Sequence, residues 1–151
     1  MAAKFICSAS SAKAVRFRLP CRLTQMRERW MADILIIDDD EDIADMVSLR
    51  LSLRGHTVHA QPNGLKGIEH AVQATPELIL VDMQMPEING EEVVERLRDK
   101  GFEGLIILLS AARIPEHLRR ALDARCNGYI SKPVERDFED QIEKYLESAH
   151  V

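Results

Sequence analysis

Short, nearly unbroken runs of Ile, Leu and Val recur between residues 34 and 130, and each is followed by a longer segment with helical periodicity. Runs of this length are typical of strands. Strands that are apolar on both faces are expected in a parallel sheet that helices cover on both sides. The pattern therefore predicts an α/β fold with five strand–helix units. The predicted strands are Ile34–Ile37, Thr57–Ala60, Leu78–Val81, Leu105–Leu109 and Gly128–Ile130.

Helix boundaries are indicated by residues with known preferences for helix ends. Gly55 and Gly101 are expected to end two helices, because glycine readily takes the left-handed conformation that follows a helix. Asn89 is expected to cap the start of a third, and Pro115 suits a first helical turn. The predicted helices run from the acidic cluster Asp38–Asp42 to about Arg54, over Gly64–Gln73 and Asn89–Lys100, from Pro115 to about Ala124, and from Glu135 to about Ser148.

The charge of the chain is divided unevenly. Residues 1–31 contain seven Lys or Arg and one acidic residue, a net charge of +6, whereas residues 32–151 contain thirteen against twenty-four, a net charge of −11. An acidic folded part argues against direct nucleic-acid binding, which requires phosphate neutralisation. No stretch approaches the roughly 18 apolar residues of a membrane span. Three widely spaced cysteines, Cys7, Cys21 and Cys126, favour a reducing, cytoplasmic location over a disulfide framework.

We therefore divide the chain at residue 31. Residues 1–31 are expected to be a disordered basic extension or an over-long start, with an organelle transit peptide as the weaker alternative. Residues 32–151 are expected to form the folded domain. Since this domain would end close to Val151, we expect no further output domain if the chain is complete.

Polar residues follow the predicted strands where each one ends. They are Asp38, Asp39, Asp82, Ser110 and Lys132. Ligands of open parallel sheets bind beyond the carboxyl ends of the strands. Taken singly, each residue could merely cap a helix or line a polar loop.

Taken together, these residues indicate a site. Two carboxylates at ~5 Å repel by on the order of 3 kcal/mol at an effective dielectric near 20. A bound divalent cation would offset this cost, and an all-oxygen ligand set suits Mg²⁺. A carboxylate nucleophile, a hard cation, a lysine and a hydroxyl could together form a phosphoryl-accepting site.

Four segments resemble the receiver domain of two-component response regulators over about residues 32–148. They are ILIIDDDEDI, LILVDMQMPEINGEE, LIILLSAA and GYISKP. The resemblance implies a CheY-like, flavodoxin-like doubly wound sheet with strand order 2-1-3-4-5 and helices on both faces. It also implies a cis peptide bond between Lys132 and Pro133, an isomer that only a bond to proline adopts at low cost.

The resemblance assigns a role to each matched residue. Asp82 would be the phosphoacceptor, with Lys132 and Ser110 beside it. Asp39 would bind Mg²⁺ directly and Asp38 largely through water. The other implied participants are the Gln84 backbone carbonyl as a metal ligand, and Ser110 and Tyr129 as the switch residues.

The resemblance implies a response regulator that is not an enzyme but assists its own phosphorylation and dephosphorylation. We expect it to be stand-alone, because no room is expected for an output domain, and cytoplasmic, because its cysteines favour a reducing compartment. Its expected partners are a histidine kinase or histidine phosphotransferase and a downstream protein target. A pseudo-receiver that no longer accepts phosphate is an alternative, weakened because every matched position is retained. A haloacid dehalogenase-type phosphohydrolase would use Asp38 as nucleophile, but that family requires Thr or Val where this chain has Asp42.

The first predicted helix leaves one question open. Ile43, Val47 and Leu51 share a face that is expected to enter the core. A neighbouring stripe of Met46, Leu49 and Leu53 could be core as well, or could stay exposed to dock a histidine-bearing helix. Two arginines, Arg50 and Arg54, fall within the same arc and would have to extend their charged ends to solvent.

Overall fold

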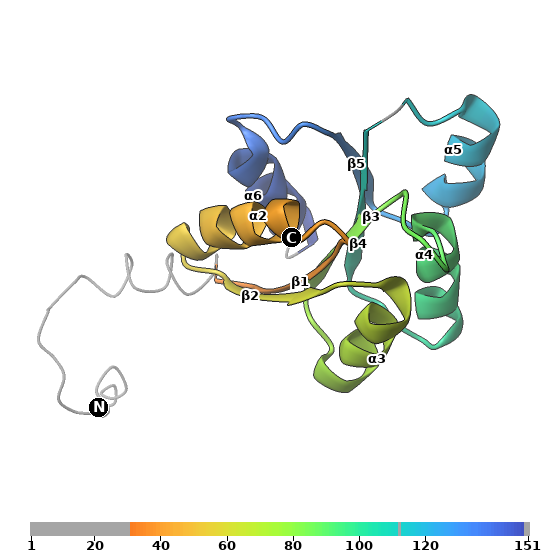
Figure 1. The fold of residues 1–151 in the computed structure, drawn as a ribbon, viewed down its shortest axis with the longest axis horizontal. Helices are drawn as coiled ribbons and strands as arrows, with labels where there is room; N and C mark the ends of the chain where they lie inside the picture. The colour runs from red at the N-terminus through yellow and green to blue at the C-terminus, as the bar shows by residue number, and fades with distance from the viewer. Residues whose placement is uncertain (1–30, 112, 150–151) are drawn as a thin grey trace, which may run out of the picture. The chain divides into compact units, whose positions relative to one another are not determined.

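The computed structural model describes residues 31–111 and 113–149, which contain one five-stranded parallel sheet (Figure 1). The strand order is β2-β1-β3-β4-β5, which confirms the expected α/β fold and topology. Apart from Met31, the predicted N-terminal segment lies outside the described residues. The strands are β1 (Asp33–Ile37), β2 (Thr57–Gln61), β3 (Leu78–Asp82), β4 (Leu105–Ser110) and β5 (Gly128–Ser131).

The helices begin and end largely where the capping residues predict. Asn89 accepts a hydrogen bond from the Glu92 backbone N–H at 2.9 Å and so caps its helix. Gly55 and Gly101 both have positive φ just beyond a helix end. Within the described ranges, no helix combines the length and the apolar composition needed to span a bilayer. The helices are α2 (Glu41–Leu53), α3 (Gly64–Ala74), α4 (Gly90–Asp99), α5 (Glu116–Asp123) and α6 (Phe138–Ala149).

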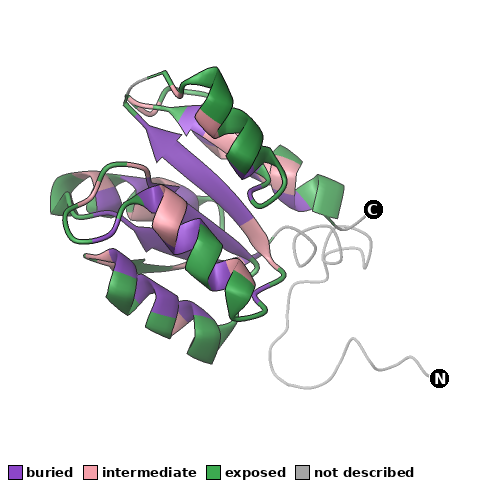
Figure 2. Cartoon of the chain, turned by 90° about the vertical axis from the view of Figure 1, so that its right-hand side faces the viewer, coloured by how far each residue is buried: buried purple, intermediate pink, exposed green. Residues whose placement is uncertain are grey.

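Helices cover both faces of the sheet, and each face has its own hydrophobic core. Side chains of α2 and α6 pack on one face, and those of α3, α4 and α5 pack on the other. Alternate residues of one strand serve the two cores: in β1, Ile34 and Ile36 join the first and Leu35 and Ile37 the second. Figure 2 shows buried strands between helices whose outer faces are exposed; the buried strands are β1, β3 and β4, whereas the edge strand β2 is mostly exposed. This burial explains the unbroken apolar runs.

The last helix begins later than the sequence indicated. We predicted a start at Glu135, but α6 begins at Phe138. The backbone carbonyls of Glu135 and Arg136 instead accept hydrogen bonds from the Arg50 guanidinium, at 2.7 and 3.4 Å. A contact with a helix 85 residues earlier in the chain therefore keeps this segment in a loop.

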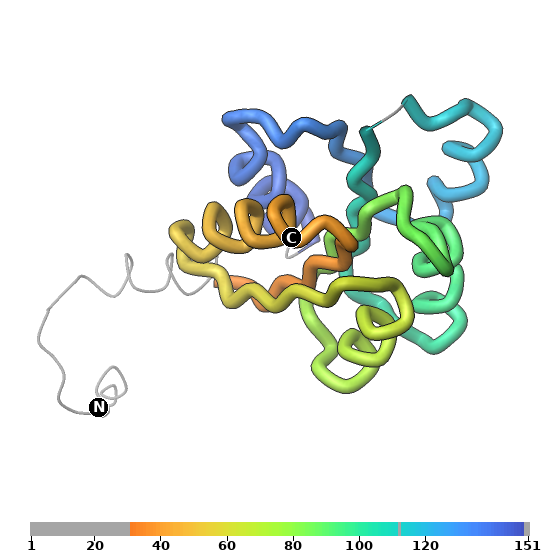
Figure 3. Tube along the Cα trace, viewed as in Figure 1, coloured from red at the N-terminus to blue at the C-terminus, as the bar shows by residue number. Residues whose placement is uncertain are grey.

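Helices α2 and α6, far apart in the sequence, lie side by side (Figure 3). Arg54 binds Asp140 and Glu143 of α6 at 3.0 and 2.8 Å, so the two arginines of α2 are paired with acidic residues of α6. The neighbouring stripe stays exposed, with Met46, Leu49 and Leu53 at 41, 62 and 78% relative exposure. These three side chains therefore lie on the surface and are not part of the core.

Candidate functional site

The parallel register brings the carboxyl ends of four strands to one edge of the sheet. Asp82 is the last residue of β3 and lies opposite Leu109 of β4. Ser110 ends β4 opposite Ser131, and Lys132 directly follows β5. The loop after β1 supplies Asp38 at the same edge. The structure thus brings together Asp38, Asp39, Asp82 and Lys132.

Three carboxylates form the acidic centre of the site. Asp38, Asp39 and Asp82 each offer one oxygen, and these oxygens all lie within 4.8 Å of one another. Asp38 and Asp82 are buried, whereas Asp39 is exposed. Burial, followed by the charge of Asp38, raises the pKa of Asp82 to about 6, because both disfavour its ionised form.

Lys132 is the cation at this centre. Its Nζ donates to Asp38 Oδ2 at 3.0 Å and lies 3.2 Å from Asp82 Oδ1. Burial opposes the ammonium charge, but the hydrogen bonds and charges of the two carboxylates outweigh it and raise the pKa of Lys132. Part of the carboxylate repulsion expected from the sequence is therefore offset within the protein itself.

The loop after β3 contacts the same Asp82 carboxylate oxygen, Oδ1, that Lys132 faces. The Gln84 backbone N–H donates to Asp82 Oδ1 at 3.3 Å, while the Gln84 side chain is exposed. Gly90 is a residue that sequence reasoning missed. A Cβ there would lie 2.7 Å from the Asp82 backbone oxygen and 2.8 Å from Met83 Cα, so only glycine fits without displacing backbone. The Asn-Gly pair at residues 89 and 90, shortly after Met85-Pro86, could have indicated a close backbone approach here.

Ser110 and Tyr129 lie on neighbouring strands but have different surroundings. Ser110 is buried at the site edge, and its backbone carbonyl accepts a hydrogen bond from the Lys132 N–H at 2.9 Å. The Tyr129 hydroxyl contacts two acceptors, Asp123 Oδ1 at 3.0 Å and the Arg119 carbonyl at 3.2 Å. In this structure the hydroxyl of Tyr129 is therefore engaged with α5.

The arrangement fits a divalent cation beside a carboxylate nucleophile. Carboxylate oxygens are the ligands that hard cations prefer, and a cation would remove the repulsion that Lys132 leaves uncompensated. Lys132 can also bind a negatively charged oxygen close to Asp82. The Lys132–Pro133 peptide bond is cis, as the resemblance implied.

Comparison with known proteins identifies the family. A family model described as the response regulator receiver domain matches residues 34–144. This chain belongs to that family. The receiver is a signalling domain of two-component systems, and response regulators interact with histidine kinases. Membership favours the receiver interpretation over the phosphohydrolase alternative, which rested on Asp38 as nucleophile.

Relatives of this receiver chain include regulators of greater length. It is 35% identical over 105 residues to the DNA-binding dual master transcriptional regulator RpaA of Synechocystis, covering 68% of this chain and 44% of RpaA. It is 36% identical over 112 residues to the nitrate/nitrite response regulator NarL of Escherichia coli, covering 73% and 52%. The chain thus spans about half the length of these two proteins.

Two further matches have lengths close to that of a receiver alone. One is a 14.6 kDa protein of Leptolyngbya boryana, 34% identical over 105 residues, which make up 68% of this chain and 80% of that protein. The other is the solved structure of a CheY-like response regulator receiver domain protein from Methanospirillum hungatei. It superposes with a TM-score of 0.73 at 26% identity and covers 80% of this chain and 97% of its own.

Proposed function

We propose that this protein is a stand-alone, cytoplasmic response regulator in which Asp82 accepts a phosphoryl group from a histidine kinase or histidine phosphotransferase in the presence of Mg²⁺. The observation that supports the proposal most directly is the Asp82 carboxylate, buried at a strand end, within 3.2 Å of Lys132 Nζ and grouped with Asp38 and Asp39. We further propose that residues 32–151 form the receiver domain and that residues 1–31 are a basic extension or an over-long start.

The transfer follows from the chemistry of these groups. An Asp82 carboxylate oxygen forms a bond to phosphorus, and the N–P bond of the donor phosphohistidine breaks. The imidazole nitrogen keeps the bonding electron pair and takes a proton from solvent. Lys132 binds a phosphoryl oxygen and stabilises its developing negative charge.

Asp38, Asp39, Asp82 and the Gln84 backbone carbonyl are the groups that would hold Mg²⁺, which supplies further positive charge to the phosphoryl oxygens. Asp39 is the candidate for a direct ligand, because it is exposed and Lys132 pairs with Asp38 and Asp82. Asp38 is better suited to act through water. With these residues and Lys132, the receiver domain itself assists the transfer of the phosphoryl group to Asp82.

Output is proposed to pass through protein contacts. The Ser110 hydroxyl moves toward the phosphoryl group, and Tyr129 exchanges its contacts with α5 for an inward position. The phosphoryl group thereby favours one of two pre-existing arrangements of the surface around β5. The downstream target is a protein rather than nucleic acid, since residues 32–151 carry a net charge of −11. The exposed stripe of Met46, Leu49 and Leu53 is a candidate docking surface for the histidine-bearing helix.

Phosphorylation by acetyl phosphate tests the proposal. With Mg²⁺, intact-mass spectrometry should detect one added phosphoryl group, and fragmentation should map it to Asp82. The Asp82→Asn variant and the parent with EDTA should remain unmodified. A phosphoryl group on Asp38 would revive the phosphohydrolase interpretation. A protein that responds to neither acetyl phosphate nor beryllofluoride would be the inert pseudo-receiver.

A further inference from the structure

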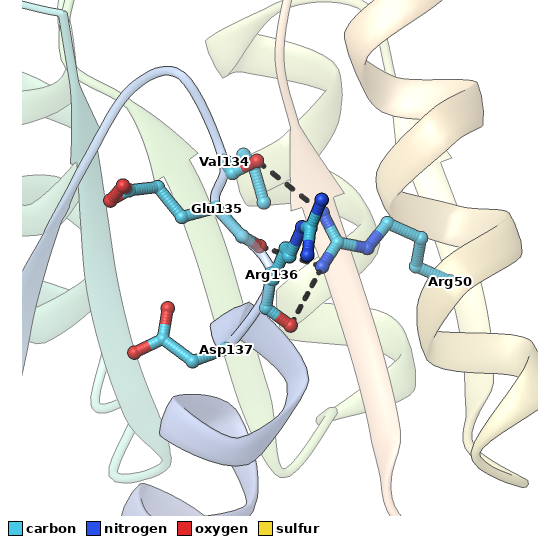
Figure 4. A pocket seen from close by; sticks show the side chains of 5 residues that line it. All are labelled: Arg50, Val134, Glu135, Arg136 and Asp137. Carbon is cyan, nitrogen blue, oxygen red and sulfur yellow. Dashed lines mark hydrogen bonds between the residues drawn. The ribbon is translucent and has the colours of Figure 1, made fainter.

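Arg50 contacts the loop that carries Lys132, although it lies outside the acidic site. Its guanidinium extends from α2 across to residues 134–137, in the loop between β5 and α6 (Figure 4). Together these residues line an open pocket of about 540 Å³. Val134 packs against the core between the sheet and α2 and α6, whereas Glu135, Arg136 and Asp137 are exposed, so apolar packing holds only the beginning of this segment.

The guanidinium binds both a carboxylate and backbone carbonyls. Nε and Nη2 donate to the two carboxylate oxygens of Glu139 at 2.7 and 2.6 Å, a bidentate pair. Nη2 also donates to the Glu135 carbonyl at 2.7 Å, with longer contacts of 3.4 Å from the guanidinium to the carbonyls of Val134 and Arg136. One side chain of α2 therefore binds three successive carbonyls and the first turn of α6.

These contacts begin two residues after Lys132. On its other side, Lys132 is fixed by its backbone N–H, which donates to the Ser110 carbonyl at 2.9 Å. The loop before α6 is thus held at two points. Its first residue, Lys132, is bonded to Ser110 of β4, and the carbonyls of residues 134–136 are bonded to Arg50 of α2. From this geometry we infer that Arg50 is a positioning residue, which holds the loop so that Lys132 Nζ stays within reach of Asp82. The inference rests on the proposed phosphoryl-accepting function.

Arg54 provides a matched control on the same two helices. Its guanidinium binds the carboxylates of Asp140 and Glu143 rather than the loop carbonyls, and its side chain is 41% exposed against 22% for Arg50. Removing either arginine breaks ion pairs between α2 and α6. Only the removal of Arg50 releases the loop after Lys132.

The test compares Arg50→Met with Arg54→Met in the full chain. We expect Arg50→Met to lower the maximal rate of phosphorylation by acetyl phosphate roughly tenfold, because small displacements of a catalytic group are costly. Its Mg²⁺ affinity, measured by calorimetry, should change less than about twofold, since no carboxylate is altered. Arg54→Met should keep the parental rate. An equal loss of rate in both variants would show that only general α2–α6 packing matters, and would overturn the inference.

Two conservative variants cover the case in which Arg50→Met does not fold. Arg50→Lys keeps the charge but lacks the planar fork, so it should remain slow. Glu139→Gln weakens the bidentate pair and should slow phosphorylation by a smaller factor. Parental rates in both of these variants would contradict a positioning role.

Hydrogen exchange separates this inference from the proposed function. The backbone amides of Lys132 and Phe138 donate to the carbonyls of Ser110 and Glu135 at the two ends of this loop. They should exchange faster in Arg50→Met than in Arg54→Met, whether or not the parent accepts a phosphoryl group. A parent protein that is not phosphorylated would contradict the proposed function. Equal hydrogen exchange in the two variants would contradict the inference that Arg50 holds the loop.

Discussion

At the scale of single residues, ionisation of Asp82 is expected to cost stability. Its pKa rises from 3.8 to about 6 on folding, so the folded protein binds this proton more tightly than the unfolded chain does. Stability therefore falls as the pH rises through this window, by on the order of 3 kcal/mol, and the cost is complete above it. Asp82→Asn should melt close to the parent near pH 4 and roughly 5 to 10 °C above it at pH 7.5, without metal.

Thermal unfolding of both proteins across this pH range checks the prediction, because carboxylates remote from the site titrate in both and cancel in the difference, while the repulsion between Asp38 and Asp82 is part of the measured effect. Asp39→Asn is the control. Its carboxylate is exposed, so its neutralisation should raise the melting temperature less. A difference between Asp82→Asn and the parent that stays constant with pH would mean that burial of Asp82 is not the source of the destabilisation.

At the scale of elements, the turn from β3 into α4 depends on close contact at Gly90. A Cβ at this position would approach the Asp82 backbone oxygen to 2.7 Å, so Gly90→Ala must displace the strand end that carries the phosphoacceptor. We expect a loss of about 1–3 kcal/mol in the free energy of unfolding, together with slower phosphorylation of Asp82.

Gly101→Ala separates these two effects. Gly101 follows α4 with φ +87, and a Cβ added there would meet no atom within 4 Å, so alanine costs stability through backbone strain alone. Chemical denaturation and acetyl phosphate kinetics should show both variants destabilised, but only Gly90→Ala slowed. Normal kinetics in a destabilised Gly90→Ala would contradict a link between this turn and the site.

The elements also show which features sequence reasoning could reach. Strands, helix caps and the meeting of Asp38, Asp82 and Lys132 followed from local pattern, because parallel strands align their carboxyl ends. The start of α6 was wrong because a contact with Arg50 outweighs local helix preference. The spacing of charged residues could have predicted the contact between α2 and α6. Arg50 and Arg54 are four residues apart in α2, and their partners Glu139 and Glu143 are four residues apart in α6.

The orientation of Tyr129 could not have been predicted in the same way. Its hydroxyl is fixed by an Asp123 side chain and by the Arg119 carbonyl, both contributed by α5. The packing of α5 against β5 decides whether these acceptors come within reach. The close approach at Gly90 is of the same kind, since it depends on how α4 is set against the end of β3.

At the scale of the whole molecule, residues 32–151 carry a net charge of −11 that any cation will partly screen, while the acidic site should bind Mg²⁺ specifically. Mass action predicts about 1.4 kcal/mol of stabilisation at ten times the dissociation constant, or a rise of about 5 °C in melting temperature. NaCl at matched ionic strength should give a smaller rise, because it screens charge without filling the site. Asp39→Asn and Asp82→Asn should each lose the excess of Mg²⁺ over NaCl but keep the NaCl response. Equal shifts from the two salts in the parent would mean that general screening, and not a bound ion, relieves the crowding of carboxylates at the sheet edge.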